Sequence, residues 1–479
     1  MLNDFPKKSY VNGQWTDAGD GKTFDLINPA TQEKIASLPD LGKSDAKSAI
    51  DAAEKALPEW KGMLATERQK ILEKWYQLIM DHTDDLAEIL TMEQGKPLKE
   101  AKGEIQNGAG FIKWYAEEGR RLYGDEIPSQ NSAQRIVVIK QPVGVCAMIT
   151  PWNFPSSMIT RKAAPALGAG CTVIIKPSEA TPLSAIALAH LAEKAGIPKG
   201  VFNIVTGDAK TIGKVLTDDP RVKKFSFTGS TKVGKTLMAQ CADTVKKVSL
   251  ELGGNAPFII FEDADIEKAA EGAVTSKFRN AGQTCICANR IFVHADIYDQ
   301  FLEKMVEKTK ALNVGNGMDE KTDIGPMINM DGLEKAEELL KDALDGGAKL
   351  HCGGDRLNDI GKQYFQPTVI TDVTPQMRIF KEEIFGPVAA IYKFDDTDEV
   401  IEKANDTQYG LAAYIYTNDL KRSWQVPERL EYGMVGVNSS LLSLPQAPFG
   451  GVKESGFGRE GGKHGIEDYI HTKYLSIQF

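Results

Sequence analysis

Residues 145–176 read VCAMITPWNFPSSMITRKAAPALGAGCTVIIK, and this stretch decides the fold. Two apolar runs, Val145–Ile149 and Thr172–Ile175, stand on either side of a segment long enough for a helix. Short runs rich in β-branched residues that alternate with helices are typical of strands buried in a parallel sheet. Right-handed crossovers between such strands build a doubly wound layer. The stretch therefore predicts a Rossmann-like α/β domain.

Further strand-like runs extend this pattern towards the carboxyl side. Val201–Val205, Lys224–Phe227 and Lys247–Leu250 complete the first series, and Pro182–Ala195 is helix-like among them. A second series within residues 256–449 predicts another α/β domain. Its strand-like members are Ile291–His294, Phe365–Val369, Val388–Phe394, Ala412–Tyr416 and Gly433–Asn438.

The segments outside these two series differ in pattern. Short strand-like pieces precede a long helical stretch, for which Ser44 is the expected N-cap, and residues 66–122 are mostly helical as well. Arg135–Gln141 and Thr472–Phe479 are strand-like but belong to neither series. Such strands must pair with something, and another subunit is one candidate.

The bulk composition excludes several classes of protein. A chain of 479 residues is too long for one core and indicates two or three domains. The net charge of −9, without a basic stripe, argues against nucleic acid and anionic membranes as partners. We find no signal-peptide pattern and no apolar run that would span a bilayer. Six cysteines without metal-ligand spacing predict no metal site and a reducing, cytoplasmic compartment.

A candidate nucleophile lies in Phe278-Arg-Asn-Ala-Gly-Gln-Thr-Cys285. The glycine and the polar neighbours of Cys285 favour an accessible turn, where a thiolate could attack a carbonyl carbon. A buried packing cysteine is the competing interpretation, with roughly even odds from this segment alone.

Polar groups also follow several of the predicted strands. Glu251 precedes two glycines and could serve as a general base, and the stiff loop Thr150–Pro155 could aim the Asn153 amide at an oxyanion. Taken singly, Glu251 is more commonly a solvated glutamate, and the loop Thr150–Pro155 is more commonly a tight turn without a catalytic role. Lys176-Pro-Ser-Glu179 could hold ribose hydroxyls, although a charged turn is more usual. Residues 229–236 formally match a phosphate-binding Walker A loop, which we discount because no convincing partner aspartate is present.

Together these segments resemble the aldehyde dehydrogenase superfamily over essentially the whole chain. The motifs that carry the resemblance are Thr150-Pro-Trp-Asn-Phe-Pro155, Lys176-Pro-Ser-Glu179, Phe227-Thr-Gly-Ser230, Glu251-Leu-Gly-Gly254, Gly282-Gln-Thr-Cys285, Glu382-Glu-Ile-Phe-Gly-Pro387 and Pro448-Phe-Gly-Gly-Val-Lys-Glu-Ser-Gly456. The resemblance implies a Rossmann-like dinucleotide-binding domain (residues 1–122 and 143–253) and an α/β catalytic domain (254–453). It further implies a small β-arm for oligomerisation (123–142 and 466–479), and hence a homodimer or homotetramer.

The resemblance also implies a mechanism. Cys285 would attack the aldehyde, and the oxyanion would be held by the Asn153 side chain and the Cys285 backbone N–H. After hydride transfer to NAD(P), Glu251 would activate water to hydrolyse the thioester. The residues implied in cofactor binding are Thr150, Trp152, Asn153, Lys176, Ser178, Glu179, Gly229, Ser230, Leu252, Glu383 and Phe385.

A narrower resemblance is to the succinate-semialdehyde dehydrogenases. It rests on Met158-Ile-Thr-Arg-Lys162, Cys285-Ile-Cys287 and Phe457-Gly-Arg-Glu-Gly-Gly-Lys-His-Gly465. It implies that Arg161, Arg279 and Ser443 bind the distal carboxylate of the substrate, whereas surface ion pairs are the usual fate of arginine. Oxidation of glutarate semialdehyde, lactaldehyde or an aminoaldehyde stays open as an alternative. Two further alternatives stay open. One is a CoA-acylating enzyme, which would not need Glu251, and the other is a non-catalytic family member.

Two further expectations concern the cofactor and the second cysteine. The Glu179 carboxylate would repel a 2′-phosphate, so we expect NAD to be preferred, with NADP possible. Cys287 has even odds of being a packing residue or a redox switch. As a switch, it would form a strained disulfide with oxidised Cys285.

Overall fold

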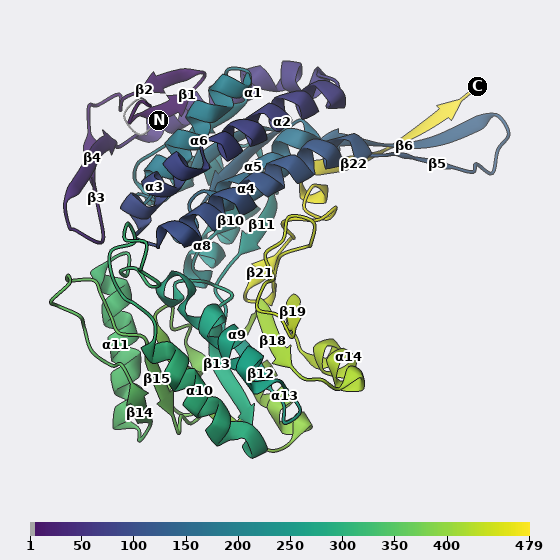
Figure 1. The fold of residues 1–479 in the computed structure, drawn as a ribbon. Helices are drawn as coiled ribbons and strands as arrows, with labels where there is room; N and C mark the ends of the chain where they lie inside the picture. The colour runs from purple at the N-terminus through teal and green to yellow at the C-terminus, as the bar shows by residue number, and fades with distance from the viewer. Residues whose placement is uncertain (1–4) are drawn as a thin grey trace.

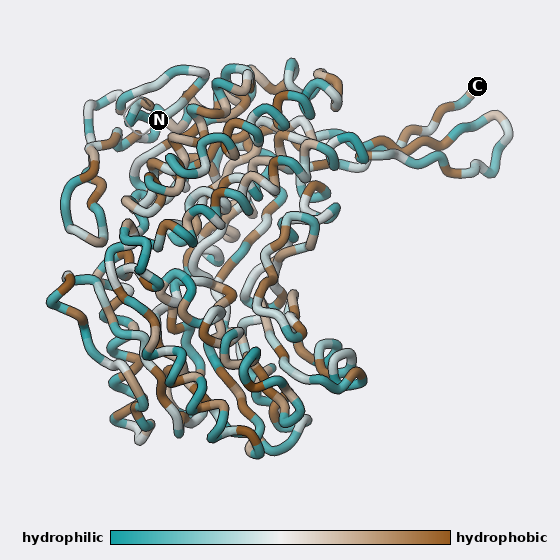
Figure 2. Tube along the Cα trace, in the orientation of Figure 1, coloured by the Kyte–Doolittle hydropathy of each residue, from teal (hydrophilic) through white to brown (hydrophobic). Residues whose placement is uncertain are grey.

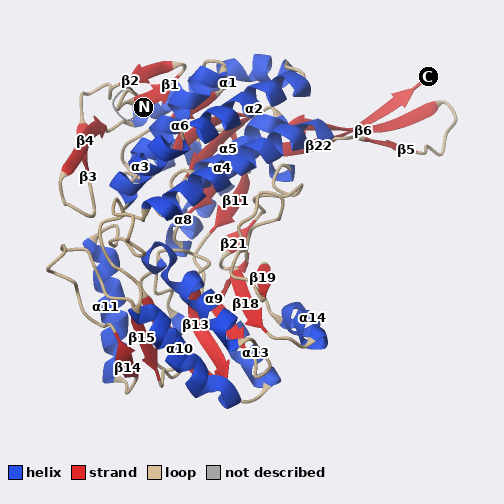
Figure 3. Cartoon of the chain, in the orientation of Figure 1, coloured by secondary structure: helices blue, strands red, loops and turns tan. Residues whose placement is uncertain are grey.

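Two α/β domains and a narrow β-arm make up the molecule, as the ribbon and the cartoon show (Figures 1 and 3). The computed structural model describes residues 5–479, so residues 1–4 of the expected first domain lie outside the described part. In Figure 2 hydrophobic and hydrophilic residues alternate along the outer helices, as expected when one face of each helix packs on a sheet.

The first sheet confirms the doubly wound prediction. Its strand order is β2-β1-β9-β8-β7-β10-β11-β21, and the five central strands are parallel. The chain winds outward from β7 in both directions, so the order reverses between β7 and β10. Ligands of such sheets bind beyond the carboxyl ends of the strands at this point. The strands are β1 (Ser9–Val11), β2 (Gln14–Thr16), β7 (Val145–Ile149), β8 (Thr172–Lys176), β9 (Phe202–Ile204), β10 (Val222–Thr228), β11 (Lys247–Glu251) and β21 (Gly456–Phe457).

Helices cover both faces of this sheet. The predicted helix Pro182–Ala195 is α6, with proline in its first turn and Gly196 as its left-handed C-cap. The Ser44 N-cap prediction is wrong, because α1 begins at Lys43 and Gly42 caps it, with its N–H donated to the Asp45 carboxylate at 2.9 Å. The other helices are α1 (Lys43–Gly62), α2 (Ala65–Asp81), α3 (Thr83–Gln94), α4 (Leu98–Glu118), α5 (Ser157–Ala169), α7 (Ala209–Asp218) and α8 (Thr231–Ala242).

The second sheet has the order β14-β15-β16-β13-β12-β18-β19 and is parallel apart from β14. The predicted strand Phe365–Val369 is displaced, because Phe365 makes only an isolated bridge and the strand begins at Thr368. The strands are β12 (Ala256–Ile260), β13 (Ala288–His294), β14 (Lys349–Cys352), β15 (Thr368–Thr371), β16 (Val388–Phe394), β18 (Ala412–Tyr416) and β19 (Met434–Val437). The helices include α9 (Ile266–Phe278), α10 (Tyr298–Lys310), α11 (Met330–Asp345), α13 (Thr397–Asn405) and α14 (Leu420–Arg429).

The two strands that belong to neither series pair with each other. β6 (Gln134–Pro142) runs antiparallel to β22 (Ile470–Gln478), and β5 (Asp125–Ile127) adds a third strand. This β-arm projects from the first domain (Figure 1) and leaves Tyr474 and Phe479 exposed. The strands of the β-arm therefore pair with each other within one chain and do not need a strand from another subunit. No helix among residues 5–479 is long and apolar enough to cross a membrane.

Candidate active site

Two loops from different sheets meet at the predicted switch point. The loop after β7 carries Asn153, and the loop after α9 carries Cys285. The Asn153 side chain donates to the Gln283 carbonyl at 3.1 Å, and the Asn280 side chain donates to the Asn153 carbonyl at 3.0 Å. Asn153 and Gln283 are 130 residues apart in sequence. The structure thus brings the predicted oxyanion amide beside the predicted nucleophile.

The backbone before Cys285 is strained. Asn280 and Ala281 both have left-handed conformations, with φ of 52° and 55°, although neither is glycine. Each such residue costs on the order of 1–2 kcal/mol, a strain that persists only where the surroundings enforce it. Gln283 supplies part of that enforcement, because its side chain donates to the Asn280 carbonyl at 3.0 Å and accepts from the Ile328 N–H at 2.9 Å.

Cys285 is half-buried, so the turn is only partly accessible. Burial, reinforced by the Glu383 and Glu251 carboxylates, raises the pKa of the Cys285 thiol well above its usual range. This shift favours the thiol of Cys285 over the thiolate that would attack a carbonyl carbon. Cys287 is buried, and its thiol donates to the Gly282 carbonyl at 3.4 Å.

Glu251 ends β11 and is 3% exposed. Neither of its carboxylate oxygens has a hydrogen-bond partner among the described residues. Burial, followed by repulsion from Glu460, raises the pKa of Glu251, while Lys162 opposes the shift. Lys162 itself is paired with Glu460 at 2.5 Å. A buried carboxyl group with a raised pKa is suited to take a proton from water near neutral pH.

A cavity of about 270 Å³ opens at the switch point and meets Cys285. The predicted cofactor residues that line it are Trp152, Asn153, Gly229, Ser230, Leu252, Glu383 and Phe385. Glu383 accepts the Gly254 N–H at 2.9 Å, and burial raises the pKa of Glu383 to about 7. A Cβ on Gly253 would approach the Glu383 carboxylate to 2.9 Å, so glycine keeps this side of the cavity open. A nicotinamide with its ribose fits these residues.

The remaining predicted cofactor residues lie at or just after the carboxyl ends of β7 and β8. Lys176 ends β8, and its ammonium pairs with Glu179 at 2.7 Å. The same Glu179 oxygen accepts the Ala209 N–H at 2.8 Å, at the start of α7. Ser178 accepts the Ala180 N–H at 3.2 Å, and the Thr150 N–H donates to the Lys176 carbonyl. None of these four predicted residues lines the cavity at Cys285.

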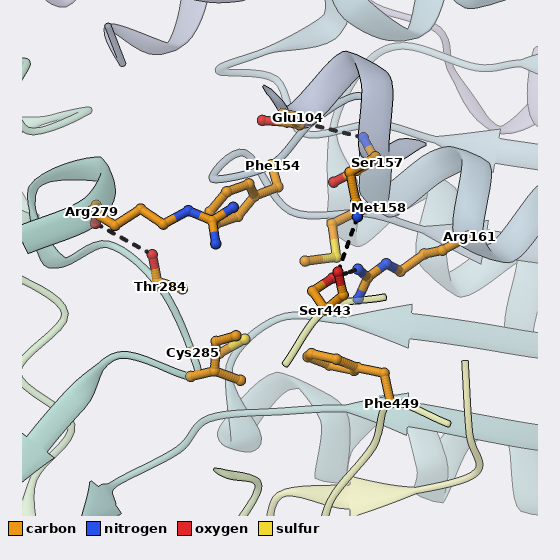
Figure 4. A pocket seen from close by; sticks show the side chains of 12 residues that line it. Glu104, Phe154, Ser157, Met158, Arg161, Arg279, Thr284, Cys285, Ser443 and Phe449 are labelled. Atoms are coloured by element: carbon orange, nitrogen blue, oxygen red, sulfur yellow. Dashed lines mark hydrogen bonds between the residues drawn. The ribbon is translucent and has the colours of Figure 1, made fainter. Parts of the chain in front are cut away.

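The predicted substrate residues surround a second cavity on the other side of Cys285 (Figure 4). The Arg161 guanidinium lies between two rings, 4.9 Å from that of Phe111 and 4.6 Å from that of Phe449. Its Nη2 donates to the Ser443 hydroxyl at 2.6 Å, and its Nη1 is ion-paired with Glu460 at 3.7 Å, whereas Nε has no hydrogen-bond partner among the described residues. Arg279 is half-buried across the cavity, with its guanidinium 4.9 Å from the Phe154 ring. Unsatisfied guanidinium donors in an apolar cavity are suited to a carboxylate.

Comparison with known proteins agrees with this geometry. The model of the aldehyde dehydrogenase family matches residues 15–475. The chain belongs to the aldehyde dehydrogenase family. It is 54% identical to the succinate-semialdehyde dehydrogenase [NADP(+)] GabD of Escherichia coli, and the alignment covers 99% of GabD. It is 53% identical to a glutarate-semialdehyde dehydrogenase of Pseudomonas aeruginosa, and the alignment covers 98% of that enzyme. These alignments cover 99% of the present chain in both cases. The crystal structure of succinate-semialdehyde dehydrogenase from Burkholderia pseudomallei superimposes with a TM-score of 0.98 at 52% identity, covering 99% of this chain and 98% of that one.

The Walker-like segment of this aldehyde dehydrogenase is a strand-to-helix turn whose first two residues, Gly229 and Ser230, line the cavity at Cys285. Its final residues lie inside α8, where Gly234 packs on Leu252 and Lys235 pairs with Glu454 at 2.8 Å. The lysine is therefore turned away from the position that a phosphate-binding loop would need.

Sequence reasoning missed several residues of the aldehyde dehydrogenase site. Lys335 lines the same cavity as the predicted cofactor residues and donates to the Glu383 carbonyl at 2.6 Å. Lys162 and Glu460 form the buried pair beside Glu251, and Phe449 packs on Arg161. Lys162, Glu460 and Phe449 belong to segments that carry the family resemblance. Their contacts join residues nearly 300 positions apart, so no local sequence pattern indicates them.

Proposed function

We propose that this aldehyde dehydrogenase oxidises succinate semialdehyde to succinate. The observation that carries the proposal is the Arg161 guanidinium, which lines the cavity at Cys285, is 2% exposed, lies between two rings, and has no hydrogen-bond partner for Nε among the described residues. The distal carboxylate could accept a bidentate pair from Nε and Nη2, which lie on the same side of the guanidinium. Relatives above 50% identity that are named for ω-carboxylated aldehydes support this substrate class.

In the proposed acylation, the Cys285 thiol loses its proton and its sulfur attacks the aldehyde carbon. The developing oxyanion accepts hydrogen bonds from the Asn153 amide and the Cys285 backbone N–H. Because one Asn153 amide hydrogen already serves Gln283, the other is available for the oxyanion. The cavity lined by Trp152 and Phe385 would hold NAD(P), whose nicotinamide would supply the hydride acceptor, and the acyl group would remain on Cys285 as a thioester.

In the proposed deacylation, Glu251 takes a proton from water, and the resulting hydroxide attacks the thioester carbon. The raised pKa of Glu251 makes it a stronger base once it is ionised. Lys162 and Glu460 set the local charge around it. A CoA-acylating enzyme would not need this glutamate, so its buried position favours hydrolysis.

For the cofactor, we propose that Glu179 favours NAD. Its carboxylate can accept hydrogen bonds from ribose hydroxyls and repels a 2′-phosphate. Lys176 and the Ala209 N–H neutralise part of this charge, which leaves room for NADP as a second cofactor. The GabD relative is named for NADP(+), so NADP is to be tested beside NAD.

For the assembly and location, we propose a cytoplasmic homo-oligomer. The β-arm projects from the domain, and its exposed apolar side chains, together with the open edge at β19, are candidate contacts between copies. All six cysteines are free, in keeping with a reducing compartment.

A panel of aldehydes tests the function. Succinate, glutarate and aspartate semialdehydes, lactaldehyde and an aminoaldehyde would be compared by reduced-cofactor absorbance, with NAD and NADP in parallel. We expect the highest kcat/KM for succinate semialdehyde. A higher value for the five-carbon glutarate semialdehyde would replace the proposed substrate, and inactivity with every aldehyde would favour a non-catalytic protein.

A further inference from the structure

A buried lysine holds the loop that carries Asn153. Lys96, between α3 and α4, is 1% exposed, and its ammonium donates to the Asn153 carbonyl at 2.7 Å. It also pairs with Glu104 at 2.6 Å and lies 3.7 Å from the centre of the Phe154 ring. A buried ammonium is tolerated only where a counter-charge and acceptors replace water. Lys96 therefore has one fixed position, and the Asn153 backbone is part of what defines it.

Glu104 holds the other end of the same loop. One carboxylate oxygen pairs with Lys96, and the other accepts the N–H groups of Ser156 at 2.9 Å and Ser157 at 3.2 Å. These N–H groups lie at the start of α5, where an anion is stabilised by the helix terminus. Figure 4 shows Glu104 beside Ser157 at the rim of the substrate cavity. The Lys96–Glu104 pair thus ties the Asn153 carbonyl to the first turn of α5.

The same helix also holds the loop of the nucleophile. Glu100, one turn before Glu104 on α4, accepts the N–H of the strained Asn280 at 3.0 Å. Asn280 in turn donates to the Asn153 carbonyl, the acceptor that Lys96 shares. Glutamates on one helix face therefore fix the two loops that meet at Cys285, although those loops follow different sheets.

We propose that Lys96 and Glu104 are positioning residues that hold the Asn153 amide where the oxyanion forms. The inference rests on the proposed oxyanion role of Asn153. A misplacement of about 1 Å at such a donor costs on the order of a hundredfold in rate. Without the pair, the Asn153 carbonyl would keep only the Asn280 donor, and the loop would lose its tie to α5.

The test uses a matched pair of variants. Glu104→Gln keeps an acceptor for the two N–H groups but removes the charge that faces Lys96. The control is Glu93→Gln, because Glu93 is also buried and accepts two N–H groups, of Leu183 and Ser184 at 2.7 and 2.8 Å, at the start of α6. We expect Glu104→Gln to lower kcat about 10- to 100-fold with little change in KM, and Glu93→Gln to leave kcat within about twofold even if Tm falls equally.

A double-mutant cycle with Asn153→Ala shows whether the pair acts through Asn153. In the Asn153→Ala background, we expect Glu104→Gln to cost less than about twofold, because the donor that it positions is gone. Lys96→Met, which removes the ammonium and leaves Glu104 with its two N–H donors, should give the same kcat loss if Glu104→Gln does not fold. Additive losses, or an equal kcat loss in Glu93→Gln, would overturn the inference. An unchanged kcat in Asn153→Ala alone would instead refute the oxyanion role.

Discussion

Replacing Arg161 with methionine removes the charge at the substrate cavity while keeping an unbranched side chain between the rings of Phe111 and Phe449. Arg161 Nε has no hydrogen-bond partner among the described residues, and a substrate carboxylate could accept from Nε and from Nη2 on the same side of the guanidinium, where Nη2 now donates to Ser443. Each charge-assisted hydrogen bond contributes about 1.5–3 kcal/mol. Because the carboxylate must also leave water, we expect a net loss of about 3 kcal/mol, equivalent to roughly 150-fold in kcat/KM.

The assay compares succinate semialdehyde with pentanal, an uncharged aldehyde of similar length. In Arg161→Met, kcat/KM should fall for the semialdehyde, mainly through KM, and stay within about threefold for pentanal, which makes no use of the charge.

Two neighbours serve as controls for this prediction. Ser443→Ala removes the partner of Nη2 but leaves the guanidinium in place, so the selective loss should be about tenfold at most. Arg279→Met tests the arginine across the cavity, whose partial exposure predicts a smaller effect than that of Arg161. An equal fall for both aldehydes in Arg161→Met would refute the proposed carboxylate clamp.

The other predictions concern the reaction steps, the cofactor and the second cysteine. Cys285→Ala should abolish dehydrogenation, whereas Glu251→Gln should slow thioester hydrolysis and leave a burst of reduced cofactor; loss of the burst in Glu251→Gln would contradict a purely deacylating role. Because the pKa of Glu383 is raised to about 7, acidification below that pH should neutralise its carboxylate and raise the KM for NAD. Glu383→Gln should remove this pH dependence. A wild-type KM for NAD that does not change across that pH range would exclude the effect. Glu179→Ser should shift the ratio of kcat/KM values towards NADP by about tenfold, and a wild-type preference for NADP would overturn the assignment of Glu179. Mild peroxide should inactivate the enzyme, and dithiothreitol should restore the activity of the wild type but not that of Cys287→Ala. If mass spectrometry of residues 280–290 shows no loss of two hydrogens, no disulfide has formed and Cys287 is only a packing residue.

Local patterns predicted much of this fold. Val145–Ile149 and Pro182–Ala195 were bounded correctly, because apolar runs, an N-terminal proline and a C-terminal glycine act within a few residues. The pairing of β6 with β22 was not predictable in the same way, since it joins segments that are far apart and carries no turn signal. Phe365 was misassigned because an apolar residue before a strand looks like part of it.

The candidate site was predicted through motifs, and the structure adds what motifs omit. Asn153 and Cys285 were singled out from their own segments, but their contact depends on loops from two sheets. The raised pKa of Cys285 arises from burial and from distant carboxylates, which polar flanking residues do not reveal. Lys96 and Glu104 were missed because a lysine and a glutamate eight residues apart look like an ordinary solvated helix end.

The β-arm has a consequence for how the protein is made. Gln134 and Ser476, which are hydrogen-bonded across the arm, are 342 residues apart. During translation β6 is therefore synthesised long before β22 and must wait with unpaired backbone groups while most of the chain is added. A strand in that condition invites pairing with neighbouring nascent chains. The rate of elongation and the supply of chaperones would then govern the yield of assembled protein, even in variants whose catalytic residues are untouched.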